Sequence, residues 1–96
     1  MIIVTGSATA RPDSFAALRQ ASLDHVRRSR TEPGCISHAV HVDCEDPLRL
    51  VFFECWQDMA TLKEHFRQPG SAEFMAAVRG LAASSEPIAM YEANVT

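Results

Sequence analysis

The segment "LRLVFFECW", residues 48–56, is apolar on both of its alternating faces, and this limits the possible folds more than any other feature. Successive side chains of a strand point to opposite sides. One face would carry Phe52, Glu54 and Trp56, and the other would carry Val51, Phe53 and Cys55. Such a strand must be covered on both sides, and the alternation leaves open which face meets helices of the same chain.

The first third of the chain predicts a strand and a long helix. Residues 2–10 begin with apolar residues and then alternate, which indicates a strand. Asp13 or Ser14 can cap the free N–H groups of an amphipathic helix over roughly residues 13–30. The stretch "TEPGC" ends this helix, because proline cannot continue it and glycine permits a turn.

The segment "CISHAVHVD" predicts a second strand by its alternation. One face would carry Ile36, His38, Val40 and Val42, and the other Ser37, Ala39, His41 and Asp43. The acidic turn "CEDP" then joins this strand to residues 48–56 as an antiparallel hairpin.

Two helical stretches and a last strand complete the chain. Asp58 is a suitable N-cap, followed by an apolar stripe of Met59, Leu62 and Phe66. "RQPGS" interrupts the helix, and Ser71 is expected to cap a further stretch that ends near "SSEP". "PIAMYEANV" alternates and predicts the fourth strand.

The predicted order is βαββαβ, the ferredoxin-like α+β arrangement of one four-stranded antiparallel sheet with its helices on one face. A chain of 96 residues suffices for a single domain, residues 1–96, with nothing left to cover the second face of the sheet. We therefore expect a homodimer packed sheet to sheet.

Charge and composition exclude several classes of partner. The net charge of −3 gives no basic surface for nucleic acid. No apolar run reaches the roughly 20 residues of a membrane span, and no secretory signal is present, so a cytoplasmic location is expected. The three cysteines form no CxxC pair, which argues against a disulfide framework and a zinc site.

His65 and Glu54 are the candidate proton-transfer residues. His65 lies beside the sheet-facing stripe of its helix, and an imidazole with a pKa near 6.5 can take up and return a proton, although a structural histidine would fit there too. Glu54, if it lies under the helices, must be paired, hydrogen-bonded or protonated. It is either a base or orienting acceptor for a phenolic hydroxyl, or a structural partner of a cation.

Aromatic residues could form a pocket. Trp56 can stack on a flat ligand or simply fill the core, and His38 can line the same space. Phe52 shares the face of Glu54, and Phe66 and Phe74 would add apolar wall. Although His25 could approach from the first helix, the histidines lack HxH or HxxxH spacing, so no metal site is expected.

The stretch "EPGCISHAVHVDCEDPLRLVFFECWQDMATLKEHF" resembles the antibiotic biosynthesis monooxygenase family, also described as quinol monooxygenases. The shared features are an E-P-G-C turn, a D-x-x-x-P hairpin, an E-x-W strand end and a helix carrying His65. The resemblance implies a dimeric α+β barrel with a pocket between sheet and helices. It also implies oxidation of phenols, anthrones or quinols by O2 without metal, flavin or haem.

The expected function is therefore a cofactor-independent monooxygenase whose partners are a small aromatic substrate, O2 and a second copy of the chain. Haem binding is not expected, because the residues "MAAVRG" after Phe74 lack the histidine ligand of haem-degrading relatives. Two alternatives stay open: an isomerase or tautomerase using the same pocket, and a non-catalytic dimeric protein that binds a small ligand.

Overall fold

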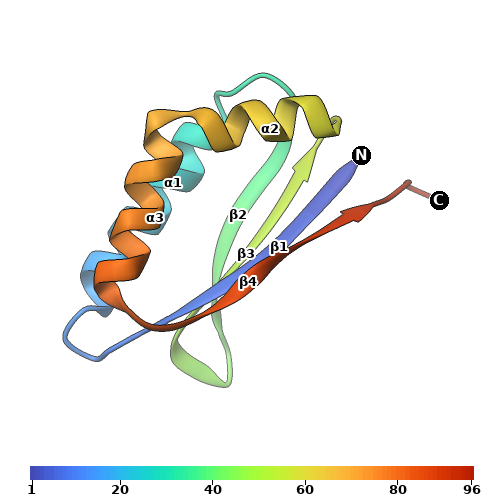
Figure 1. Cartoon of the computed structure of the whole chain (residues 1–96). Helices are drawn as coiled ribbons and strands as arrows, with labels where there is room; N and C mark the ends of the chain where they lie inside the picture. Colours follow the sequence, from blue (N-terminus) through green and yellow to red (C-terminus); the bar gives the residue numbers. More distant parts are fainter.

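The computed structural model describes all 96 residues as one four-stranded antiparallel sheet with three helices (Figure 1). In chain order the elements are β1 (Ile2–Ala10), α1 (Phe15–Ser29), β2 (Cys35–Asp43), β3 (Asp46–Trp56), α2 (Met59–Arg67), α3 (Pro69–Leu81) and β4 (Ala82–Glu92). The strand order is β2-β3-β1-β4, which confirms the ferredoxin-like α+β fold. None of the helices has the length and apolarity needed to cross a membrane.

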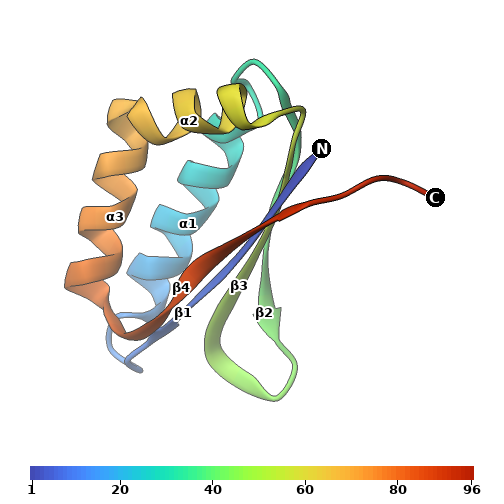
Figure 2. The same cartoon turned by 45° about the vertical axis from the view of Figure 1, so that its right-hand side comes forward.

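All three helices cover the same face of the sheet, and the other face carries no element of this chain (Figure 2). This arrangement decides between the two faces of β3. Phe52, Glu54 and Trp56 are buried under the helices, whereas Phe53 is 45% exposed on the opposite face. The question that alternation left open is thus answered by where the helices pack.

The buried face divides into two apolar clusters. One includes Leu18 and Phe52, and the other includes Trp56 and Leu62. Glu54 lies between Phe52 and Trp56 on the same strand face, so a carboxylate separates the two clusters. A polar centre is therefore built into the middle of the core.

The caps expected for the first two helices have different outcomes. The Asp58 carboxylate accepts a hydrogen bond of 2.8 Å from the Thr61 N–H at the start of α2, as expected. Ser14 precedes α1, but its side chain makes no capping bond and instead donates to the Leu81 carbonyl at 2.6 Å. We expected Asp13 or Ser14 to cap this helix; Ser14 takes the N-cap position, but a tertiary contact uses its hydroxyl.

The second helical region begins and ends earlier than expected. α3 begins at Pro69, a residue favoured in the first helical turn, and the Ser71 hydroxyl donates to the His65 carbonyl at 2.6 Å rather than capping α3. α3 ends at Leu81, and the stretch "SSEP", near which we expected the helix to end, already belongs to β4. Pairing with β1 imposes this extended structure on a stretch with little strand propensity of its own.

A β-bulge places Ile36 on a different face of β2 from the one we expected. Cys35 pairs with Trp56 and Ser37 pairs with Cys55, so that Ile36 is the extra residue of β2. Ile36 is 58% exposed, whereas His38 is buried, so these two residues do not share a buried face. The bulge turns Cys35 toward the core, where it packs against the cluster of Trp56.

The turn between α1 and β2 is in direct contact with α2. Gly34 has a φ of 82°, in the left-handed region that favours glycine. A Cβ atom on Gly34 would lie only 2.4 Å from the Cβ of Thr61. The Gly34 carbonyl also accepts a hydrogen bond of 2.8 Å from the Gln57 N–H. The missing side chain therefore lets α2 approach the turn closely.

We expect Gly34→Ala to lower the free energy of unfolding by about 1–3 kcal/mol or more, because alanine would be strained at this φ and would collide with Thr61. Gly80→Ala is the matched control. A Cβ at Gly80, within α3, meets nothing within 4 Å, so this variant should be more stable by about 0.5–1 kcal/mol. Urea denaturation of both variants measures the difference, and equal effects would contradict the packing described for the turn.

Candidate active site

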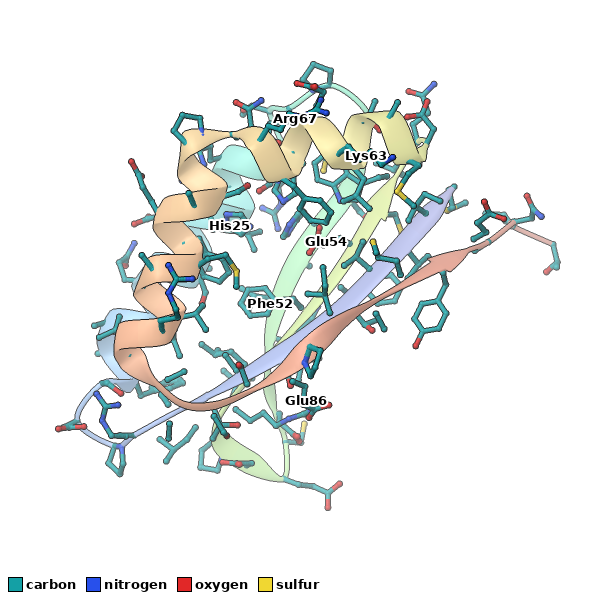
Figure 3. All side chains as sticks on the ribbon, in the orientation of Figure 1. His25, Phe52, Glu54, Lys63, Arg67 and Glu86 are labelled. Carbon is teal, nitrogen blue, oxygen red and sulfur yellow. The ribbon has the colours of Figure 1, made fainter.

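A cavity of about 470 Å³ lies between the sheet and the helices. Its wall is mostly apolar and includes Phe52, Phe74, Val78 and Ile88. The ionisable residues that line it are His25, Glu54, His65 and Glu86. Figure 3 shows that His25 comes from the helix layer, whereas Phe52 and Glu54 come from the sheet. An apolar cavity with a few convergent polar groups is the usual form of a small-molecule site.

His65 is held by a carboxylate from the turn after α1. Its Nδ1 lies 2.8 Å from Glu32 Oε1, and both side chains are nearly buried. A carboxylate oxygen is an acceptor, so Nδ1 carries the proton and donates it in this bond. In a neutral His65 the lone pair is then on Nε2, which lies 4.0 Å from Glu54 Oε1. The pair has the geometry of an oriented general base.

Glu54 is an ionised carboxylate with three partners beneath the helices. Its Oε1 accepts a hydrogen bond of 2.9 Å from Trp56 Nε1 and lies 3.2 Å from His38 Nε2. Burial alone would raise the pKa of Glu54. The contacts with His38, the indole N–H and His65 outweigh burial and hold this pKa below its usual value. Glu54 therefore keeps its negative charge at neutral pH.

His25 is also buried, but its surroundings favour the uncharged form, whereas those of Glu54 favour the charged form. Arg28 Nη2 donates to its Nδ1 at 2.8 Å, so the His25 proton is on Nε2. The ring stacks on Phe74, with centroids 4.2 Å apart and planes within 7°. Burial, followed by the neighbouring His38 and His65 and then Arg28, lowers the pKa of His25 from 6.5 to about 3. His25 is therefore neutral across the physiological range.

His38 is 1% exposed, and neither of its ring nitrogens makes a well-aligned hydrogen bond. The contact of 3.2 Å with Glu54 is therefore close but poorly directed. A buried imidazole without aligned partners is uncommon and costly.

The fold brings three histidines together that are distant in sequence. His25, His38 and His65 come from α1, β2 and α2, and their ligand atoms lie within 4.8 Å of one another. From the sequence we expected no metal site, because the histidines lack HxH or HxxxH spacing. Spacing along the chain does not reveal this cluster, since each histidine belongs to a different element.

The expected site residues divide between the cavity wall and the core. His65, Glu54, Phe52, Phe66 and Phe74 line the cavity, with Phe66 at its mouth because it is 43% exposed. By contrast, Trp56 and His38 are almost fully buried and do not line it. Trp56 thus acts on the site by donating to Glu54, without presenting a face to a ligand.

Sequence reasoning did not single out Glu32 and Arg28. Glu32 was part of the quoted E-P-G-C turn, so the signal was present, but its partner His65 is 33 positions away. No pattern in the sequence indicates that the Arg28 guanidinium meets His25.

A family model and a relative from Synechocystis each match most of this chain. Residues 1–77 match the family model described as antibiotic biosynthesis monooxygenase. A Synechocystis protein named sll1783, described as uncharacterized, is 33% identical over 91 residues, which are 95% of this chain but only 62% of that protein. This chain therefore spans less than two thirds of that relative.

Solved structures of similar chains share the whole fold. A Deinococcus radiodurans protein, whose name assigns it to the antibiotic biosynthesis monooxygenases, superposes with a TM-score of 0.94 at 27% identity, covering 100% of this chain and 95% of its own. Rv0793 from Mycobacterium tuberculosis gives a TM-score of 0.84 at 27% identity, covering 99% and 95%.

The low pKa of His25 makes the protein less stable in acid. Below pH 6.5 the unfolded chain takes up a proton at His25, whereas the folded chain does so only near pH 3. This group should therefore remove about 2 kcal/mol of unfolding free energy between pH 7.5 and pH 5. Urea denaturation across this range should show a flatter profile for His25→Gln, which does not titrate.

His41→Gln is the matched control, because His41 is an exposed histidine of β2 on the other face of the sheet. It should retain the acid sensitivity of the natural chain. If His25→Gln keeps the full dependence on pH, the assignment of this sensitivity to His25 is wrong.

Proposed function

The chain belongs to the antibiotic biosynthesis monooxygenase family, and on that premise we propose that it oxidises a quinol, an anthrone or a related phenolic aromatic with O2 and no cofactor. The observation that carries the proposal is the Glu32–His65 pair on the wall of an apolar cavity. A flat phenolic substrate suits this cavity, since most of its surface is apolar and its hydroxyl can meet an oriented base.

His65 is the proposed general base. Glu32 accepts a hydrogen bond from the Nδ1–H group of His65. Nε2 is then free to accept the proton of a substrate hydroxyl or of an acidic C–H bond. The charge of Glu32 also stabilises the imidazolium that forms. Glu32 is therefore a positioning residue that acts through His65.

The substrate anion formed by this step is electron-rich. It transfers one electron to O2, the two radicals combine to form a C–O bond, and the hydroperoxide, after gaining a proton, loses water as a carbonyl forms. One oxygen atom enters the quinone product and the other leaves in water, while the substrate supplies all the electrons. The share of the protein is proton transfer, orientation and a cavity that excludes water.

The same geometry suits an isomerase or tautomerase. Glu54 Oε1 lies 4.0 Å from His65 Nε2, so one cavity offers two groups that can exchange a proton with neighbouring substrate atoms. This alternative needs no oxygen, and so oxygen dependence separates the two.

We also propose the homodimer that the sequence led us to expect. We define the outer face of the sheet by five residues on three neighbouring strands: Ile3 on β1, Val51, Phe53 and Cys55 on β3, and Tyr91 on β4. Phe53 and Tyr91 are 45% and 53% exposed in the single chain. Packing this apolar face against the same face of a second copy, related by a two-fold axis, would remove it from water.

Oxygen uptake tests the oxygenase. Metal-free protein with a panel of quinols and anthrones should consume O2 faster than substrate autoxidation, and His65→Ala should lower this rate by about 10²–10⁴-fold. Glu32→Ala should lower kcat and shift its pH profile, with Glu32→Gln retaining more activity because its amide oxygen still accepts from Nδ1. His41→Ala should retain full activity.

Two results would count against this function. No uptake above autoxidation across the panel would reject the oxygenase and leave the isomerase, assayed without oxygen, as the next reaction to test. Uptake that His65→Ala leaves unchanged would reject His65 as the base. Ligand binding that persists in that variant without any product would favour a binding protein.

Sedimentation tests the dimer. Phe53→Asp places a charge in the outer face and should convert a dimer of the natural chain to monomers at micromolar concentration. Met75→Asp is the matched control, because Met75 is also about half exposed but lies on α3 in the helix layer. A natural chain that sediments as a monomer would contradict the proposed assembly.

A further inference from the structure

We propose that His25, His38 and His65 form a binding site for a divalent transition metal ion, with Glu54 as the fourth ligand. The three side chains are buried, and their ligand atoms lie within 4.8 Å of one another. Imidazole groups favour zinc, copper, nickel and iron over calcium or magnesium. The proposal rests on the positions of these residues alone and does not depend on the oxygenase reaction.

The spacing of the three rings fits a tetrahedral ion. With metal–nitrogen distances of about 2.0–2.1 Å, three imidazoles around a tetrahedral metal have ring centroids about 5 Å apart and nitrogens about 3.3 Å apart. The centroids here are separated by 5.3 Å, 5.3 Å and 5.7 Å. The rings are thus at nearly the required spacing, and rotating them would bring the ligand atoms, which lie within 4.8 Å of one another, to ligand geometry.

His38 supplies a second, independent observation. Both of its ring nitrogens are buried, and neither makes a well-aligned hydrogen bond. Leaving a buried polar atom unsatisfied is destabilising, because its hydration is lost without replacement. A metal ion would use one nitrogen as a ligand and so remove part of this cost.

The partners of His65 and His38 have the arrangement of a metal site. Glu32 binds Nδ1 of His65 and leaves Nε2 as the ligand atom, which is the carboxylate–histidine pairing found behind many metal ligands. Glu54 Oε1 lies 3.2 Å from His38 Nε2 and 4.0 Å from His65 Nε2. This oxygen can reach an ion placed between the rings and would neutralise part of its charge.

His25 must change its tautomer to take part. Arg28 now donates to Nδ1, so a metal at Nε2 requires the proton to move to Nδ1 and the guanidinium to turn away. Arg28 is half-buried, and its Nε has no hydrogen-bond partner, so its bond to His25 is the one hydrogen bond of the guanidinium that this movement would break.

A bound ion would take the Nε2 lone pair of His65, which the proposed oxygenase uses as its base. The metal would then inhibit that reaction instead of assisting it. Binding is measured separately from activity, so each proposal can fail without the other.

Calorimetric titration of the metal-free natural chain with Zn²⁺ tests the site. We expect one ion per chain, and a Co²⁺ complex with the visible absorption bands of a four-coordinate ion. His25→Ala, His38→Ala and His65→Ala should each weaken binding by more than the roughly 10 to 100-fold that loss of an outer partner costs, and Glu32→Gln by about 10 to 100-fold. His41→Ala should bind as the natural chain does.

Two outcomes would overturn the proposal: no binding by the natural chain, or binding that His41→Ala removes, which would place the ion on the sheet surface. If a histidine variant fails to fold, anomalous diffraction from a crystal of the natural chain grown with Zn²⁺ locates the ion. A peak between the three rings supports the site, and a peak only elsewhere rejects it.

Discussion

The charge of Glu54 is the constraint on which the rest of the site depends. A carboxylate on a central strand under a helix layer must be satisfied there, because an unpaired buried charge would cost several kcal/mol. Trp56, His38 and His65 provide this compensation from β3, β2 and α2. The hydrogen bond of Trp56 also makes the largest fully buried side chain part of the polar centre. The same contacts therefore stabilise the core and keep Glu54 charged in the site.

The turn between α1 and β2 connects backbone conformation to the proposed chemistry. Gly34 adopts a left-handed conformation and leaves room for Thr61, so α2 lies directly against the turn. His65 follows Thr61 by one helical turn and thus faces Glu32, which lies two positions before Gly34. This one turn therefore follows the end of α1, packs against α2 and orients the imidazole that we propose as the base.

The break between α2 and α3 has a similar effect on the other side of the cavity. Pro69 ends one helix and begins the next, and α3 turns to place Phe74 against the ring of His25. Gly70 leaves the space that the Arg28 guanidinium occupies, since a Cβ there would lie 2.1 Å from Arg28 Nε. The helix break therefore helps to place two neighbours of His25, the Phe74 ring and the Arg28 guanidinium. The local sequence predicts the break but not these contacts.

The sequence by itself determined the order of elements, the Asp58 cap, the hairpin and the division of β3 into two faces, because these follow from local periodicity and turn chemistry. It also identified Glu54 and His65. Only the tertiary structure decided which face of β3 the helices cover, that Ile36 is a bulge, and that β4 begins at Ala82. Likewise the Glu32–His65 pair and the three-histidine cluster join residues of separate elements, whose meeting depends on how helices pack across the sheet. Periodicity along one element carries no information about such contacts.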